Sequence, residues 1–381
     1  MTGSLNGDTI ITAGNEYDQV ASDVISGHTD EDGNFVASGD TAIQAKKINI
    51  EAGKETYSGS TVNKSKQSGL TIALSIPAVN ALGDAVTSAS DIGESKNTRV
   101  NAMAVANTAM DAYQAKNAIG ALKGLSDVTS IQDAASATGA SLSVTVGSSQ
   151  SKSTTIYEGT NVVSSTVGGE NVTLKATGDK EKSDINIVGS NISGTSSTTL
   201  SSDHDINILA AASYDEQHST NKSSGWNAGA VISAGAIGAT LGGNVGKGKV
   251  DGVGTVYTNS HVGSLLGTTT INAGDTTNII GGQVLGDSVK LTTSNLNIES
   301  LQDTSTYDSQ QKNISGQITV GAGWGSASGS ASKSNIDANY ASVNEQSGII
   351  AGDKGYDVSV VNNTNLIGGI ITVPRKQKMI I

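Results

Sequence analysis

The sequence repeats itself, and the repeats constrain the fold more than any other feature. Three stretches, beginning at Ile48, Ile206 and Leu296, share one order of parts. Each opens with an alternating strand that has asparagine at its centre, continues through a polar stretch with a tyrosine, reaches a Ser-Gly pair and closes on a second alternating strand. Internal periods of this kind indicate a stacked array of repeats. The asparagines are Asn49, Asn207 and Asn297, and the glycines of the pairs are Gly69, Gly225 and Gly316.

A second kind of segment follows the first and begins with tyrosine. Full copies begin at Tyr157, Tyr257 and Tyr340, and a degenerate copy begins at Tyr17. The full copies are 100 and 83 residues apart. The large unit therefore has roughly 80–100 residues and contains several rungs of the roughly 20 residues typical of solenoids. We expect the tyrosines to cap or stack on neighbouring rungs, and sugar binding is the alternative.

The shortest strands explain how such units stack. Residues 173–176, 185–187 and 206–208 alternate in polarity, so each strand buries one face and exposes the other. Pairs such as Gly-Asp and Gly-Gly between them supply turns. Stacked rungs need few bulky side chains, which fits a chain with 47 glycines and 3% aromatic residues. The pattern predicts an all-β solenoid or sandwich.

One segment breaks the strand pattern. Residues 77–138 are rich in alanine, and apolar residues between Val100 and Tyr113 recur at steps of three and four, which places them on one helical face. We predict an α-helical insertion here. Its removal shortens the spacing from Ile48 to Ile206 from 158 to roughly 97 residues, close to the 90 residues between Ile206 and Leu296.

Composition excludes several classes of protein. The net charge is −12 and no basic stripe is visible in the sequence, which argues against nucleic-acid binding. The chain has no cysteine, so it is not a disulfide scaffold. The N-terminus lacks the pattern of a signal peptide. The longest stretch of small apolar residues, 229–243, is shorter than the roughly 20 residues of a spanning helix.

Candidate chemical sites are few, and simpler interpretations compete with each. His204 lies between Asp203 and Asp205, a pattern that could form a metal or acid–base cluster, but we favour a polar turn before the strand at Ile206. Calcium at scattered Gly-Asp turns is an alternative to aspartate as a turn former. Trp226 and Trp324 follow Ser-Gly pairs on projecting hairpins, where we favour local packing over ligand contact. The chain has two arginines, too few for a polysaccharide lyase. We therefore expect no enzyme, no catalytic residues, no cofactor and no bound metal.

The repeat residues resemble a known family. Residues 339–371 and 6–26 resemble the haemagglutinin repeat of filamentous-haemagglutinin-type exoproteins, and the alanine-rich residues 93–115 resemble an insertion within them. The resemblance implies a right-handed parallel β-helix with projecting hairpins. The expected organisation is β-helix repeats with a first hairpin over 1–76, the helical insertion over 77–138, β-helix haemagglutinin repeats over 139–373 and a divergent tail over 374–381.

The resemblance also implies a function and its partners. It implies a stalk of a secreted or cell-surface exoprotein that is exported through an outer-membrane two-partner secretion transporter and acts in adhesion, cell–cell contact or virulence. The alternative is a module that engages the target outer membrane and delivers a C-terminal toxin in contact-dependent growth inhibition. The expected partner is a receptor on a host or neighbouring bacterium. The family's leader, secretion domain and pretoxin motif are not seen here, so we expect a fragment of a longer exoprotein.

Overall fold

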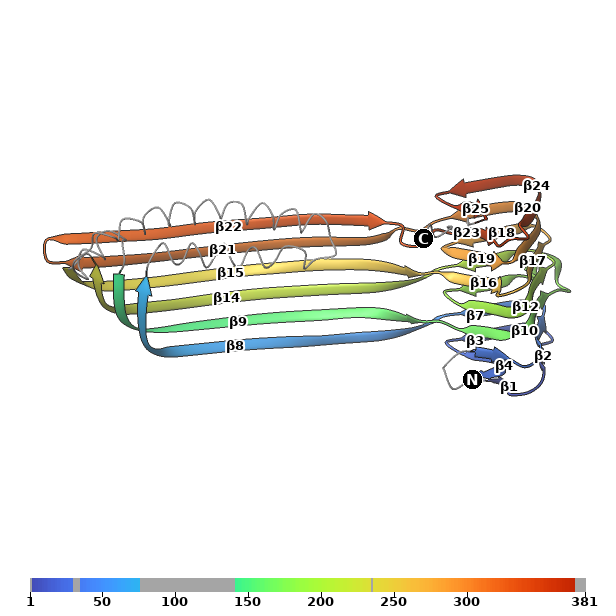
Figure 1. The fold of residues 1–381 in the computed structure, drawn as a ribbon, viewed down its shortest axis with the longest axis horizontal. Coiled ribbons are helices and arrows are strands. Elements are labelled where there is room, and N and C mark those ends of the chain that lie inside the picture. Colours follow the sequence, from blue (N-terminus) through green and yellow to red (C-terminus); the bar gives the residue numbers. More distant parts are fainter. Residues whose placement is uncertain (1, 30–34, 76–140, 234–235, 374–381) are drawn as a thin grey trace, which may run out of the picture.

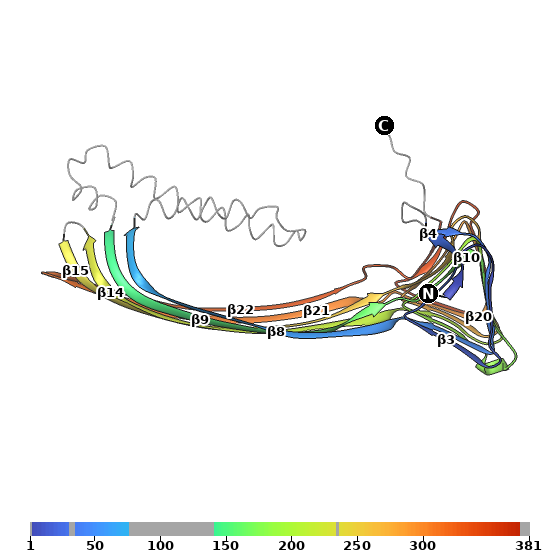
Figure 2. The ribbon, with the colours of Figure 1, turned by 90° about the horizontal axis from the view of Figure 1, so that it is seen from below.

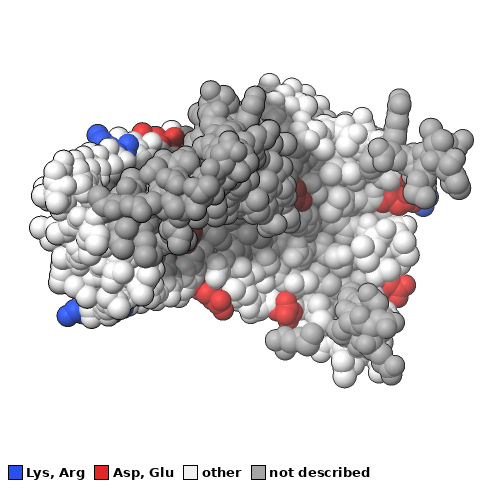
Figure 3. Space-filling view, turned by 60° about the vertical axis from the view of Figure 1, so that its left-hand side comes forward, with Lys and Arg blue, Asp and Glu red and all other residues white. Residues whose placement is uncertain are grey.

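The computed structural model describes residues 2–29, 35–75, 141–233 and 236–373. Short parallel strands stack into a column that is triangular in cross-section, and a long antiparallel sheet projects from one of its corners (Figures 1 and 2). Charged side chains are few and scattered on the face shown in Figure 3. None of the described residues forms a helix long and apolar enough to cross a membrane.

The column has three sides, and each is a parallel sheet that continues from turn to turn. The first side consists of β1 (Thr2–Ser4), β4 (Asp23–Thr29), the first halves of β10 (Thr166–Ala176) and β12 (Asn191–Ser202), β16 (Ser260–Ser264), β19 (Gly282–Gly286), β23 (Gly348–Ala351) and β25 (Ile370–Thr372). The second side consists of β2 (Thr9–Thr12), β6 (Thr41–Ala45), the second halves of β10 and β12, β17 (Thr268–Ala273), and the first halves of β20 (Ser288–Glu299) and β24 (Tyr356–Ile367). The third side consists of β3 (Glu16–Val20), β7 (Lys47–Glu51), β11 (Ile185–Val188), β13 (Ile206–Leu209), β18 (Thr276–Ile280) and the second halves of β20 and β24.

The core is a set of aliphatic columns that run through the stack. Equivalent residues pair in register, so Ile50, Ile187, Ile208, Ile279 and Ile298 lie above one another inside the third side, each at most 1% exposed. Leu174 and Leu200 lie in the equivalent column of the second side. Each side chain buried this fully contributes roughly 1.5–3 kcal/mol. Stacking of like on like therefore holds the turns together without large aromatic residues.

Two small elements lie outside the three sides of the column. The strand β5 (Phe35–Ala37) pairs antiparallel with the end of β4. A 3₁₀ turn, η2 (Lys180–Lys182), lies between the second and third sides of one turn. Neither element adds a buried hydrophobic residue to the core among the described side chains.

Three long hairpins leave the column at the end of its third side and form a single antiparallel sheet. Their strands are β8 (Gly53–Ser75) with β9 (Ser141–Val163), β14 (Ala211–Ser233) with β15 (Ala236–Thr258), and β21 (Asp303–Gly321) with β22 (Trp324–Ser342). They lie in the order β22-β21-β15-β14-β9-β8. The hairpins follow β7, β13 and β20, so they leave on every second turn of the column.

The turns between the hairpins close through a tight corner with one residue in the left-handed region. These residues are Ala21, Gly189, Gly281 and Gly368, with φ of 45°, 57°, 65° and 62°. Three of the four are glycine, which adopts this conformation without a steric penalty. Alternation of tight corner and hairpin therefore sets a repeat of two turns.

This alternation explains why the hairpins pair with one another. Neighbouring strands lie about 4.8 Å apart in any sheet, so two turns of the column rise about as far as one two-stranded hairpin is wide. Each hairpin therefore fills the interval to the next, and β9 pairs with β14 and β15 with β21 over nearly their whole lengths. The column and the projecting sheet share one spacing.

The expected all-β parallel β-helix with projecting hairpins is confirmed. The large unit of the sequence is two turns plus one hairpin. The polar stretch between the two strand-like runs is itself strand, because β8 continues through it for 23 residues. The helical insertion over 77–138 and the tail over 374–381 lie outside the described residues, and the domain boundaries stay predictions.

Candidate functional site

The predicted asparagines lie in one ladder along the third side of the column. The side-chain amide of Asn207 donates to Asn186 Oδ1 at 2.8 Å, and Asn278 donates to Asn207 Oδ1 at 2.7 Å. Asn297 donates to Asn278, and Asn186 donates to Asn49, each at 2.8 Å. Because each amide both donates and accepts, the ladder is satisfied only when the turns are in register. The triplet Ile-Asn-Ile marks Asn186 in the sequence.

The predicted tyrosines do not share one environment. Tyr157 lies in β9 over Gly59 of β8, and a Cβ at Gly59 would collide with its ring. Tyr17 lies in β3 of the column, where its hydroxyl donates to Gln19 Oε1 at 2.9 Å. Tyr257 and Tyr340 lie near the ends of β15 and β22, where these strands return to the column. A cap role and a sugar-binding role both remain hypotheses.

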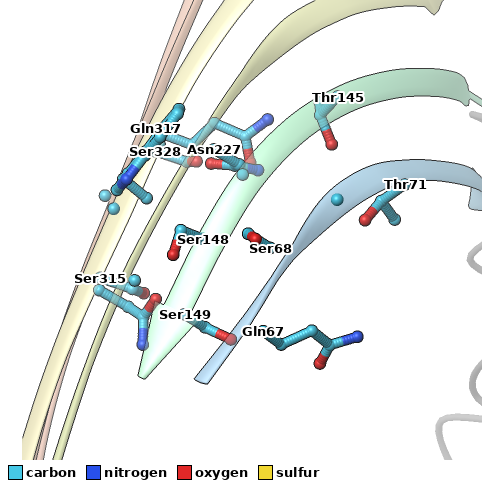
Figure 4. A pocket seen from close by; sticks show the side chains of 18 of the residues that line it. Gln67, Ser68, Thr71, Thr145, Ser148, Ser149, Asn227, Ser315, Gln317 and Ser328 are labelled. Carbon is cyan, nitrogen blue, oxygen red and sulfur yellow. The ribbon is translucent and has the colours of Figure 1, made fainter. Parts of the chain in front are cut away.

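The glycines of the Ser-Gly pairs line a hollow across the hairpin sheet (Figure 4). Gly69, Gly225 and Gly316 lie at neighbouring positions along their strands, not at one shared register position. Serine and glycine dominate the lining, so few side chains stand above the backbone there. Amides border it, and Gln317 donates to Thr240 Oγ1 at 2.8 Å. The hollow offers hydroxyl and amide groups but no charged group.

His204 lies at a corner of the column beside three carboxylates. Its Nδ1 is 2.8 Å from Asp184 Oδ1 and 3.8 Å from Asp205 Oδ2, and its Nε2 is 3.9 Å from Asp275 Oδ2. The hydrogen bond to Asp184 raises the pKa of His204 above its usual 6.5, and the nearby carboxylates add to this effect. Asp203 instead accepts from the backbone N–H of Gly178 at 2.8 Å.

This corner also contains the one set of described residues with the geometry for metal ligation. One ligand atom from each of Asp184, His204 and Asp205 lies within 4.8 Å of the others. Backbone N–H groups already occupy both carboxylates, because Asp205 donates to Asp184 and Thr276 donates to Asp205. The cluster therefore satisfies the backbone of a polar corner. Asp184 and Asp275 come from neighbouring turns, and sequence adjacency to His204 does not reveal them.

The raised pKa of His204 gives a pH-dependent contribution to stability. Because the pKa of His204 is higher in the folded than in the unfolded state, protonated His204 stabilises the fold fully below about pH 6. This stabilisation is lost as the pH rises through the folded-state pKa. We expect His204→Gln to lower the free energy of unfolding by about 0.5–1 kcal/mol at low pH and by less at high pH. Urea unfolding at pH values on both sides of this pKa measures the difference. The exposed His28→Gln is the control, and an equal loss at both pH values would contradict the prediction.

Comparison with known proteins agrees with this architecture. The sequence pattern of the hemagglutinin repeat matches residues 144–315. The chain is 37% identical to the tRNA nuclease CdiA of Yersinia mollaretii, over 97% of this chain and 12% of that protein. It is 34% identical to the toxin CdiA of Escherichia coli, over 97% and 12% respectively. It is 32% identical to the deoxyribonuclease CdiA of Yersinia pseudotuberculosis, over 97% and 33%. No solved structure matches the chain.

The three-sided column and its regular hairpins define a β-solenoid built from haemagglutinin repeats. The matches extend over nearly the whole chain, although the chain spans only about an eighth of the length of the first two relatives. The chain belongs to the family of filamentous-haemagglutinin and contact-dependent growth inhibition exoproteins, and it corresponds to a segment of them.

Proposed function

We propose that this chain is a segment of an elongated adhesive stalk on a secreted, cell-surface exoprotein. The observation that carries the proposal is the column itself, whose turns repeat in register along one axis. Every turn adds about 4.8 Å of length at the cost of few residues, so the fold supplies reach. The hairpin sheet adds a broad surface to one corner of the column (Figure 2). A long column can extend from one cell to another, and a broad surface offers area for contact between them.

The proposal includes the partners that such a stalk requires. The exoprotein passes through an outer-membrane transporter of a two-partner secretion system and meets a receptor on a host cell or a neighbouring bacterium. The family matches support this setting, because proteins called CdiA share nearly the whole segment. Delivery of a toxin across the target outer membrane is the alternative function, and it places the same segment against the same cell.

We also propose that the segment itself is not an enzyme. One relative is called a tRNA nuclease and another a deoxyribonuclease, yet both contain this segment over 97% of its length. A segment that both proteins share does not determine which nucleic acid is cut. The nuclease activity of those relatives is therefore expected to reside elsewhere in their chains.

Adhesion of beads to cells tests the stalk function. Beads coated with the purified chain should bind bacterial cells severalfold more than beads coated with the unfolded chain, and soluble chain should compete. The reason is that the contact surface exists only when the hairpin sheet is formed. Equal binding of cells by folded and unfolded chain would overturn the proposal.

A further inference from the structure

A straight row of six lysines crosses the whole hairpin sheet. Cross-strand pairing places Lys64 opposite Lys152, Lys152 opposite Lys222, Lys222 opposite Lys247, Lys247 opposite Lys312 and Lys312 opposite Lys333. Directly paired residues point to the same face, so all six side chains lie on one side of the sheet, here called the lysine face. All six are exposed. At about 4.8 Å per strand the row is roughly 24 Å long.

The row is not explained by stability. Like charges directly opposite one another on neighbouring strands destabilise a sheet, and the row contains five such pairs in succession. Among the described residues, no carboxylate lies within ion-pair distance of any of the six. The nearest acidic row on this face contains Asp251, Asp308 and Asp337, which lie four residues from the lysines toward the column. Lys249 lies between the two rows and is 3.1 Å from Asp251.

Beyond the lysines, the same face becomes aliphatic toward the far end of the hairpins. Between Lys247 and the far end of β15 lie Val245, Leu241 and Ile237. Between Lys312 and the far end of β21 lie Ile314, Ile318 and Val320. Each of these six side chains is more than half exposed. Leu70 and Val146 continue the apolar band across β8 and β9. Solvent-exposed aliphatic rows of this extent mark a contact surface.

Trp226 lies within the apolar band, on the far side of Val245 and Ile314 from the lysine row. It shares the lysine face because it is four residues from Lys222 in β14, and it is 55% exposed. Basic side chains beside an apolar band that contains an indole match the phosphates, the interface and the acyl chains of a lipid leaflet. The opposite face of the sheet differs, because its equivalent positions include the buried Thr145, Thr240 and Thr319.

We propose that the lysine face of the hairpin sheet is a docking surface for a lipid leaflet that carries anionic phosphate headgroups. The six lysines bind the phosphates in a line, and their long stems let the apolar band reach the acyl chains. A soluble polyanion would match the lysines but would leave the apolar band and Trp226 exposed to water. This surface goes beyond the proposed stalk function, which stands whether or not the lysines bind lipid.

Vesicle binding by the whole purified chain tests the proposal. The chain should co-sediment with phosphatidylcholine vesicles that contain phosphatidylglycerol, and it should not co-sediment with pure phosphatidylcholine. Replacing all six lysines of the row with glutamine should weaken partitioning more than about a hundredfold, since each basic residue at such a surface contributes roughly fivefold. A matched control replaces six other lysines, Lys46, Lys175, Lys180, Lys182, Lys290 and Lys354. Both variants have a net charge of −18, so only the position of the charge differs.

Tryptophan fluorescence separates lipid from soluble polyanion and binding from misfolding. In a Trp324→Phe background the emission reports Trp226 alone, and Trp324 has a buried indole N–H without a hydrogen-bond partner, so phenylalanine should be tolerated. We expect a blue shift of the Trp226 emission with anionic vesicles.

Urea unfolding shows whether the row variant is folded. The six-glutamine row variant should unfold at the same or a higher urea concentration than the parent, because like-charge pairs are removed. Binding of dextran sulfate without binding of vesicles, or equal vesicle binding by the row and control variants, would overturn the proposal.

Discussion

Removal of the central hairpin β14–β15 should divide the projecting sheet while leaving the column folded. In this variant, residues 210–260 are replaced by Gly-Ser, which copies the tight corner at Gly189 and Ser190, because Leu209 is equivalent to Val188 and His261 to Asn191. The turns of the column still stack, because β13 and β16 are joined as β11 and β12 are. The outer hairpins, however, are left about two strand widths apart, and β9 and β21 each lose the partner that they pair with in the intact sheet.

Hydrogen exchange measured by mass spectrometry checks this result. We expect amide protection in β9 and β21 to fall by more than about tenfold, because isolated two-stranded hairpins are marginal in water. Protection in the column should not change. Removal of the edge hairpin β21–β22 in the same way is the matched control, since it should leave β8, β9 and β14 protected. Unchanged protection of β9 in the central deletion would show that the hairpins do not depend on one another.

A single charge inside the column should be more damaging than any surface change. Leu174 and Thr173 are adjacent in β10 and face opposite ways, and Leu174 is 0% exposed while Thr173 is exposed. We expect Leu174→Asp to lower the free energy of unfolding by about 4 kcal/mol or more, because an unpaired carboxylate would lie between Ile43 and Leu200. Thr173→Asp should change it by about 0.5 kcal/mol or less.

Urea unfolding followed by circular dichroism measures both variants. The two substitutions introduce the same carboxylate into the same strand, so charge and β-propensity cancel in the comparison and burial remains. Similar midpoints for the two variants would contradict the register of the second side. This one pair of mutants therefore tests which side chains of β10 point into the column.

The sequence predicts the individual strands of this fold better than the way in which the turns and hairpins are arranged relative to one another. Alternation in 185–187 and 206–208 identifies strands because a buried face requires it, and the repeated asparagine marks equivalent positions. The two-turn period is harder to see, because Gly189 and Gly281 look like many other glycines of the chain. Only the stack shows that they occupy the corners where no hairpin leaves.

Contacts between distant segments are the part that the sequence does not reveal. Asp184 lies 20 residues before His204, and a search for neighbouring charges does not find it. The lysine row is the clearest case, because its six lysines lie on six different strands and none of them belongs to a run of consecutive basic residues. The row forms only when the three hairpins are set in register, which depends on the turns at their ends and on their bases in the column.

The shared spacing of column and sheet limits how such a gene can change in length. Insertion or loss of one turn would move a hairpin to the wrong height and leave a gap or a clash beside it. Gain or loss of two turns with their hairpin, about 90 residues as between Ile206 and Leu296, would keep every strand paired. Recombination between repeats should therefore be tolerated in steps of this unit, and each step would lengthen the reach of the stalk and widen its surface together.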